Sequence, residues 1–141
     1  RHFTVWKDDK AVKSKADMLA NLHSREAVVV DARGAGRFTG EEAEPRPEMA
    51  SGHIPGSRNL PFGNLYNPDG TWKRGDDLVA AFTQAGVELD KAMITTCGSG
   101  MTAAVLLFGA RLTGKKDVAL YDGSWSEWGL DKDTPKETGA A

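Results

Sequence analysis

The sequence has few of the residues from which metal and disulfide sites are built. It holds one cysteine, Cys97, which excludes an internal disulfide framework and a multi-cysteine metal site. Its three scattered histidines show no metal-ligand spacing. No apolar run approaches the roughly 20 residues that cross a bilayer. The formal net charge of −2 argues against a nucleic-acid binder. We therefore expect no metal, no cofactor, no nucleic acid and no membrane.

The first residues, 1–5, also lack the pattern of a signal peptide. With a single cysteine, a reducing, cytoplasmic setting is the expectation. What is present is ordinary for one globular domain: 141 residues, of which 40% are hydrophobic and 27% charged. A chain of this length can bury a real core.

Alternating apolar strands and helices predict an α/β domain with a central parallel sheet flanked by helices. Strands are expected at 27–30, 93–96 and 118–121, with at most a short one at 58–61. Helices are expected at 14–23, from 76 or 77 to 85, from the cysteine loop to about 113, and at 125–128, the first and last capped by Ser14 and Ser124. Residues 34–57 are interpreted as an ordered loop, and the polar tail 131–141 as frayed.

The most informative feature is Cys97, which stands between a buried strand and a helix, with Gly98 and Gly100 beside it. Backbone N–H groups of such a loop and the positive end of the helix dipole both stabilise negative charge. A cysteine in this place can lose its proton at neutral pH and act as a nucleophile. The alternative is an inert, buried thiol, but the two glycines favour the reactive interpretation, because they let N–H groups turn toward an anion.

Arginines form the second pattern. Arg33, Arg37 and Arg46 all follow the first predicted strand, whose carboxyl end lies at the same sheet edge as Cys97. Arginine binds carboxylates through two parallel hydrogen bonds, so a small anionic substrate is indicated. His53 is the one histidine in this region, and we expect it to hydrogen-bond within the turn at 52–56 rather than to take part in the chemistry.

Two other functions are tested by the same loop. A cysteine phosphatase needs an arginine six residues after its cysteine, and that position is Ala103. A dinucleotide site needs a third glycine and an acidic ribose partner, and neither is evident. Both interpretations are set aside.

Taken together, these segments resemble rhodanese-type sulfurtransferases, and most of all the C-terminal, catalytic half of 3-mercaptopyruvate sulfurtransferases. The resemblance covers nearly the whole chain in order and rests on VDAR at 30–33, GRF at 36–38, EPR at 44–46, GHIPGS at 52–57, CGSGMTA at 97–103 and YDGSW at 121–125. Thiosulfate-using members carry basic residues in the second and third places of the cysteine loop. Here those places hold Gly98 and Ser99, which is the mercaptopyruvate pattern.

The resemblance implies roles for particular residues. Cys97 would take sulfur from 3-mercaptopyruvate, release pyruvate and hold a persulfide, while Ser99 would present its hydroxyl to the reacting group. Arg37 and Arg46 would hold the substrate's carboxylate and carbonyl. The remaining loop residues would supply N–H groups around the sulfur: Gly98, Gly100, Met101 and Thr102. Arg33, Asp31 and His53 are expected to be scaffold, and Trp125 and Trp128 to be core or domain-contact residues.

It also implies partners. A thiol, cyanide or a thioredoxin-like reductant would accept the sulfur, and a similar N-terminal rhodanese-like domain would complete the pocket. Residues 1–13 are then expected to be the end of an interdomain linker and 14–141 the catalytic domain. Two alternatives stay open: a thiosulfate:cyanide sulfurtransferase, and a rhodanese-like module that only relays persulfide or binds a partner without catalysis.

Overall fold

A computed structural model describes residues 12–98 and 101–139 of the chain. Within them, five strands form one parallel sheet with the order β1-β5-β4-β2-β3. The central pair is β2 (Ala27–Asp31) and β4 (Ala92–Thr96), which match along all five residues, from Ala27 opposite Ala92 to Asp31 opposite Thr96. The parallel sheet that the sequence predicts is therefore confirmed.

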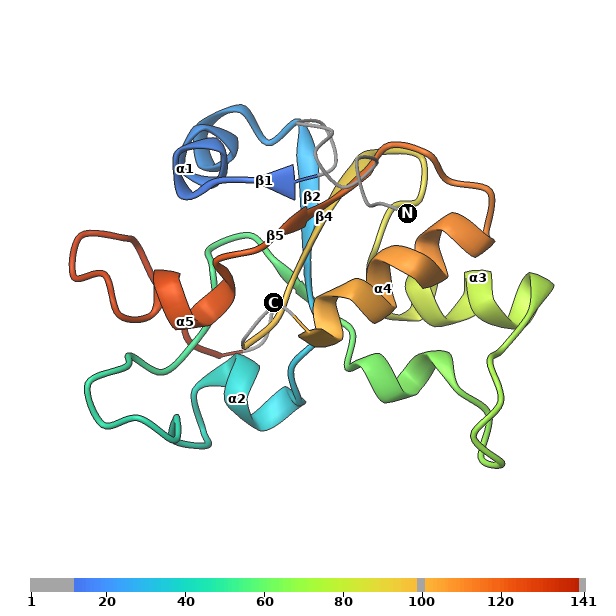
Figure 1. Cartoon of the computed structure of the whole chain (residues 1–141), viewed down its shortest axis with the longest axis horizontal. Helices are drawn as coiled ribbons and strands as arrows, with labels where there is room; N and C mark the ends of the chain where they lie inside the picture. Colours follow the sequence, from blue (N-terminus) through green and yellow to red (C-terminus); the bar gives the residue numbers. More distant parts are fainter. Residues whose placement is uncertain (1–11, 99–100, 140–141) are drawn as a thin grey trace, which may run out of the picture.

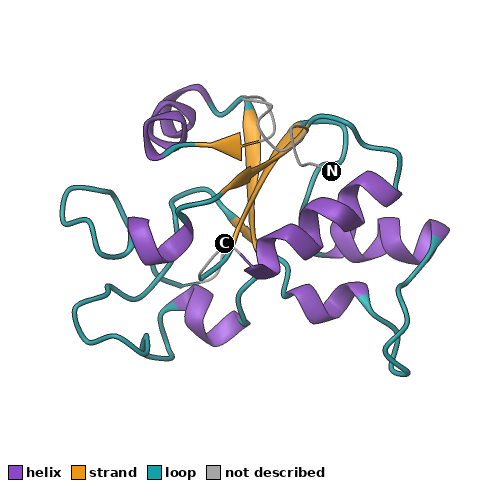
Figure 2. Cartoon of the chain, viewed as in Figure 1, coloured by secondary structure: helices purple, strands orange, loops and turns teal. Residues whose placement is uncertain are grey.

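Helices cover both faces of the sheet (Figures 1 and 2). α3 (Gly75–Gln84), α4 (Met101–Leu112) and the short 3-10 turn η2 (Phe62–Leu65) lie on one face, and α1 (Lys15–Ser24) and α5 (Ser124–Trp128) on the other. Each face has its own core, because neighbouring residues of a strand point to opposite sides. Val30 packs into the core under α3 and α4, whereas Val29 packs with Met18, Trp125 and Trp128.

The outer strands are short. β5 (Val118–Tyr121) pairs with β4, β3 (Arg58–Asn59) pairs with β2, and β1 (Val12–Lys13) pairs with β5. The last two residues of the expected linker are thus a strand of the sheet, while the rest of that segment lies outside the described residues. The helix predicted at 14–23 is confirmed, and Ser14 caps it in a capping box with Asp17.

Three local expectations are wrong. The segment 34–57 is not all loop, because α2 (Ala35–Thr39) forms between Gly34 and Gly40, which ends it with a positive φ of 89°. Its five residues are too few to show helical periodicity, and contacts elsewhere hold it. The tail is not frayed as far as Gly139: Thr134 is buried, and the backbones of Glu137 and His53 exchange two hydrogen bonds.

The third concerns Ser124, which does not cap α5. The N-cap is Gly123, and no side chain caps the helix there. Ser124 is instead the first residue of the helix, is fully buried and has a positive φ of 55°. Its hydroxyl donates to the carbonyl of Tyr121, which leaves it facing inward.

No helix in the described part of the chain is long and apolar enough to cross a membrane. Across the same residues, no group of three or more His, Cys, Asp or Glu side chains gathers in a way that could hold a metal ion.

Candidate active site

Cys97 follows the carboxyl end of β4 at the middle of the sheet. The preceding carbonyl, that of Thr96, accepts from the N–H of Ala32 at 2.8 Å, so β2 supports the strand to its end. Beyond that point α5 takes over: the N–H of Trp125 donates to the carbonyl of Cys97 at 2.8 Å, and that of Ser126 to Gly98 at 2.9 Å. The start of the cysteine loop is therefore fixed by hydrogen bonds from the end of β2 and from the first turn of α5.

Ser124 contacts the thiol directly. Its Oγ lies 3.9 Å from Sγ of Cys97 and also 3.4 Å from the N–H of Cys97, which donates to it. With its single hydrogen directed at the Tyr121 carbonyl, 3.1 Å away, this hydroxyl can accept from a thiol. When the sulfur carries negative charge, the same hydroxyl can rotate and donate to it. The sequence does not predict this contact, because Ser124 carries the signal of a helix cap.

A line of alternating charges runs beside the cysteine loop, from Asp31 through Arg33 and Glu44 to Arg37. Arg33 binds both carboxylate oxygens of Asp31, with its Nη2 2.8 Å from Oδ2. Its Nη1 lies 3.1 Å from Oε2 of Glu44, whose Oε1 is 2.6 Å from Nη2 of Arg37. The side chains of Asp31, Arg33 and Glu44 are buried, and only Arg37 is partly exposed, by 31%. Burial is tolerable because each charge meets an opposite one.

Arg37 is the predicted substrate-binding arginine that the structure brings to the loop. A β-carbon at Gly98 would lie 3.4 Å from its Nη2, and 3.9 Å from Cδ of Arg33. The hydrogen bond to Glu44 raises the pKa of Arg37 above its already high ordinary value, so the group is a permanent cation. The side chain thus presents a fixed positive charge next to the residue that follows Cys97.

Arg46 is not part of this line of paired charges. Its side chain is 55% exposed, and its Nε is 3.5 Å from Oε1 of Glu48 on the surface. Among the predicted loop residues, Thr102 is half-buried in the first turn of α4, and Met101 is the first residue of that helix. Ser99 and Gly100 fall outside the described residues, so their predicted roles stay predictions.

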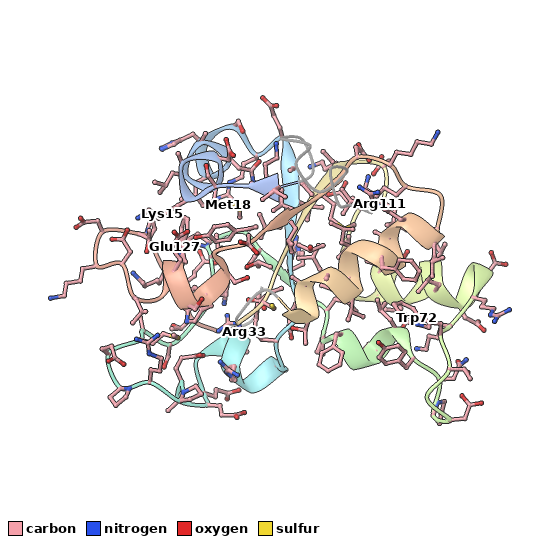
Figure 3. All side chains as sticks on the ribbon, viewed as in Figure 1. Lys15, Met18, Arg33, Trp72, Arg111 and Glu127 are labelled. Carbon is pink, nitrogen blue, oxygen red and sulfur yellow. The ribbon has the colours of Figure 1, made fainter. Side chains whose placement is uncertain are left out.

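The residues expected to be scaffold are buried. Besides its charged partners, Arg33 donates 2.6 Å to the carbonyl of Gly52 and stacks over the ring of Trp125, 4.6 Å from its centroid. Figure 3 shows Arg33 between α2 and α5, at the end of the strands where the site lies. Trp125 and Trp128 are buried core residues.

His53 is also buried. The sequence predicts that its ring bonds within its own turn, and the structure shows that this is wrong. Nδ1 is 2.7 Å from the carbonyl of Phe38, and the two rings stack at 3.8 Å. Because a carbonyl only accepts, Nδ1 carries the proton and Nε2 faces Glu137, whose Oε1 is 3.3 Å away. His53 thus ties α2 to the C-terminal segment, and through α2 it supports the position of Arg37.

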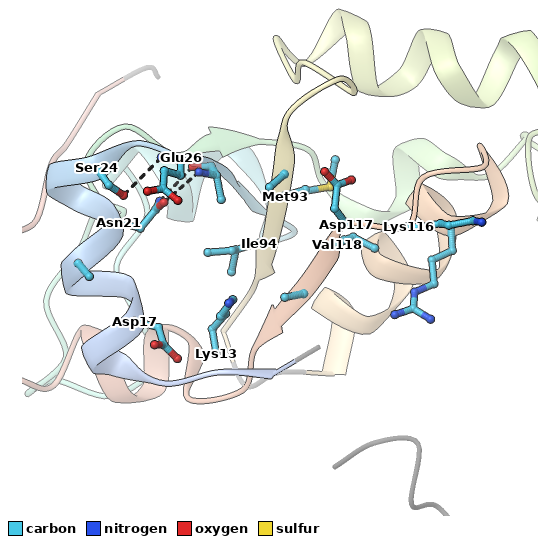
Figure 4. Close-up of a pocket in the computed structure, with 15 residues that line it drawn as sticks. Lys13, Asp17, Asn21, Ser24, Glu26, Met93, Ile94, Lys116, Asp117 and Val118 are labelled. Atoms are coloured by element: carbon cyan, nitrogen blue, oxygen red, sulfur yellow. Dashed lines mark hydrogen bonds between the residues drawn. The ribbon is translucent and has the colours of Figure 1, made fainter. Parts of the chain in front are cut away.

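A hollow of about 680 Å³ lies at the opposite edge of the sheet (Figure 4). Its floor is formed by the first residues of β4 and β5, including Met93, Ile94 and Val118, and its rim by charged side chains such as Lys13 and Asp17. In parallel α/β sheets, ligands bind at the carboxyl ends of the strands. The hollow is at the amino ends, so it does not occupy the usual place of an active site in such a sheet, whereas Cys97 does.

Comparison with known proteins agrees with this geometry. Residues 14–131 match the model of the rhodanese-like domain family. The chain belongs to the rhodanese-like family. It is 45% identical over 126 residues to mouse 3-mercaptopyruvate sulfurtransferase, and 43% identical over 127 residues to the thiosulfate sulfurtransferase of Cricetulus griseus. Each match covers 89% of this chain but only 42% and 43% of the relative.

The solved structure of the Tum1 protein from Saccharomyces cerevisiae has the same fold. It matches with a TM-score of 0.79 and 34% identity, over 89% of this rhodanese-like chain and 45% of the yeast one. The chain therefore spans less than half the length of each of these three relatives. Family membership and fold are established by these matches, and the predicted family resemblance is confirmed.

Proposed function

We propose that this rhodanese-like chain is a sulfur-transfer domain in which Cys97 takes sulfur from 3-mercaptopyruvate and passes it on as a persulfide. The observation that carries the proposal is the position of Cys97 at the carboxyl end of β4 with the Arg37 cation beside Gly98. A nucleophile and a planar anion-binding group at one sheet edge suit a small, negatively charged sulfur donor.

The first half-reaction follows from these groups. The Cys97 thiolate attacks the sulfur of 3-mercaptopyruvate, an S–S bond forms and the C–S bond breaks. The electron pair of the broken bond goes to carbon, giving the pyruvate enolate, which takes a proton and leaves as pyruvate. Arg37 holds the donor's carboxylate and Arg46 its carbonyl. Ser99 presents its hydroxyl to the reacting group, as the family resemblance implies. By the family resemblance, backbone N–H groups at 98 and 100–102 would stabilise the negative sulfur.

In the second half-reaction an acceptor thiol, such as that of a thioredoxin-like reductant, attacks the outer sulfur of the persulfide. The Cys97 thiolate leaves, and the acceptor carries the sulfur away as its own persulfide. The hydroxyl of Ser124, 3.9 Å from Sγ of Cys97, can donate to the sulfur whenever it is charged. A similar N-terminal domain would close the pocket above these groups, in keeping with relatives that are more than twice as long.

Thiosulfate is the competing donor, because a relative named thiosulfate sulfurtransferase is 43% identical to this chain. A doubly charged donor favours extra cations in the loop, and Gly98 supplies none. A β-carbon at Gly98 would contact the side chains of Arg37 and Arg33, so a basic side chain there would meet two positively charged residues.

The test is steady-state kinetics with both donors and a common thiol acceptor. The proposal predicts a clearly larger kcat/KM for 3-mercaptopyruvate. A larger value for thiosulfate would replace the proposed donor. Persulfide accepted from another protein, with neither small donor used, would identify a relay module instead.

A further inference from the structure

Glu44 is a buried carboxylate with two arginine partners, and the proposed mechanism does not use it. Its Oε1 accepts from Nη2 of Arg37 at 2.6 Å, and its Oε2 accepts from Nη1 of Arg33 at 3.1 Å. A longer contact of 3.4 Å joins Nε of Arg37 to the same Oε2. The Glu44 side chain has no exposed surface. Glu44 thus bridges a buried arginine to the partly exposed one beside the cysteine loop.

The buried end of this bridge is well anchored. Arg33 donates to both oxygens of Asp31, which ends β2, and to the carbonyl of Gly52, and its guanidinium lies over Trp125. These partners come from a strand, a loop and a helix, so Arg33 cannot shift without breaking several contacts. Glu44 therefore transmits a fixed position from the end of β2 to Arg37.

The exposed end of the bridge is oriented as a result. Arg37 turns the edge formed by Nε and Nη2 toward Glu44, which leaves Nη1 and the second hydrogen of Nη2 for a ligand. The same Nη2 is the nearest atom to a β-carbon placed at Gly98, at 3.4 Å. A guanidinium held along one edge keeps the planar fork of its remaining donors in one direction, toward the cysteine loop.

We propose that Glu44 is a positioning residue for donor recognition, which aims Arg37 at the carboxylate of an anionic donor in front of Cys97. This inference rests on the proposed function, because it assigns Arg37 to the donor's carboxylate. A carboxylate this close offsets part of the positive charge of Arg37, so it lowers the bulk attraction for anions. What it adds is direction, and in a site that must place one sulfur atom against Sγ, direction outweighs charge.

Direction and bulk charge make opposite predictions for Glu44→Gln. This change keeps the shape of the side chain but removes its charge and one acceptor. If only charge matters, an uncompensated Arg37 attracts anions more strongly. If Glu44 positions Arg37, anion recognition at Cys97 falls although the local net charge becomes more positive.

The experiment compares two alkylating agents on the folded protein: iodoacetate, which carries a carboxylate, and iodoacetamide, which is neutral. The ratio of their rates at Cys97 cancels the intrinsic reactivity of the thiol. We expect Glu44→Gln to lower the iodoacetate-to-iodoacetamide ratio roughly tenfold, since a charge-assisted hydrogen bond is worth about one to two factors of ten. In an Arg37→Ala background the same change should have no further effect.

The matched control is Glu88→Gln. It removes the carboxylate that pairs with Lys91 on the surface just before β4, where the two side chains are 63% and 49% exposed, and should leave the ratio unchanged. Circular dichroism and thermal melting show which variants are folded. If Glu44→Gln does not fold, Glu44→Asp keeps the charge but is shorter by one methylene, and a smaller drop in the ratio that also depends on Arg37 is expected.

An unchanged or higher ratio in folded Glu44→Gln overturns the inference, and so does an equal drop in the Arg37→Ala background. Loss of folding in both Glu44 variants also overturns it, because the role would then be structural. Failure of the proposed function looks different. In that case the protein takes no sulfur from 3-mercaptopyruvate, while the alkylation ratio still reports whether Glu44 aims Arg37 at a small carboxylate.

Discussion

The two edges of the sheet differ in how they hold their charges. At the carboxyl edge, Asp31, Arg33 and Glu44 are buried, and each is paired within 3.1 Å. At the amino edge, the charged residues around the hollow include Arg111 and Lys116, both exposed to solvent. Figure 3 shows Arg33 and Arg111 at these two opposite ends. The comparison shows buried, paired charges beside the cysteine loop and solvent-exposed charges around the hollow, and for this reason we place the proposed anion site at the carboxyl edge.

The largest effect on activity is expected for the two predicted substrate-binding arginines, Arg37 and Arg46. Arg37→Lys keeps the charge but cannot bond to Glu44 and to a substrate with one planar group, so kcat/KM for 3-mercaptopyruvate should fall by roughly tenfold to a hundredfold, the loss expected for a charge-assisted hydrogen bond. Arg46→Lys should also lower it within this range. Pyruvate release in a steady-state assay measures both.

Unchanged kcat/KM in these two variants would contradict the proposed difference between the two edges of the sheet, because the arginines at the carboxyl edge would then bind no anion. A decrease that comes only with unfolding would do the same, so thermal melting accompanies each assay. Arg46→Lys should leave stability nearly unchanged, since exposed ion pairs are worth at most about 1 kcal/mol, and Arg37→Lys keeps a cation beside Glu44.

The second effect is on stability and concerns Arg33. Its replacement by methionine leaves Asp31 and Glu44 buried without their shared partner, and breaking a buried ion pair in this way costs about 3–5 kcal/mol. Urea unfolding should show a loss of this size. A loss below about 1 kcal/mol, as for a surface pair, would mean that the network does not hold the carboxyl edge together.

A smaller effect is expected from Ser124→Ala. The hydroxyl accepts from the N–H of Cys97, donates to the carbonyl of Tyr121 and lies 3.9 Å from the sulfur, so for the reacting sulfur its removal takes away one long hydrogen bond. Such a bond is worth about 0.5–1.5 kcal/mol, which corresponds to a slowing of persulfide formation by roughly twofold to tenfold. Stopped-flow mixing with 3-mercaptopyruvate measures the rate, and a rate equal to that of the unaltered chain would remove Ser124 from the site.

The smallest effect is expected at the amino edge. Lys116→Ala and Arg111→Ala change the rim of the hollow but lie at the far end of the strands from Cys97. Sulfur transfer and its donor preference should stay the same within error in both variants. A clear loss of donor preference would contradict the account, since it would give the hollow a part in recognition.

Much of the fold could be predicted because its signals are local. The buried strands at 27–30, 93–96 and 118–121 are continuous apolar or β-branched runs, and Ser14 and Gly86 mark helix ends by their own chemistry. The position of Cys97 at the carboxyl end of its strand follows from strand direction alone. What escaped prediction depends on contacts distant in the sequence: α2 is held from outside, and the tail is tied down by His53, 84 positions from Glu137 in the chain.

The site itself divides in the same way. Arginines after a parallel strand are a local pattern, so Arg37 could be named as a candidate, whereas the contacts of Glu44 and Ser124 could not be foreseen. An acidic residue among several in 41–48 gives no sign that it alone is buried between two arginines. Ser124 carries the signal of a helix cap, and only the neighbouring strand end shows that it faces a thiol instead.

The most direct test of the central claim is the intact mass of the protein after mixing with 3-mercaptopyruvate, measured before and after treatment with a reductant. The account predicts the gain of one sulfur atom, its loss on reduction, and no gain in Cys97→Ser. Sulfur uptake by Cys97→Ser, or no uptake by the unaltered protein, would contradict the claim that Cys97 accepts sulfur from this donor.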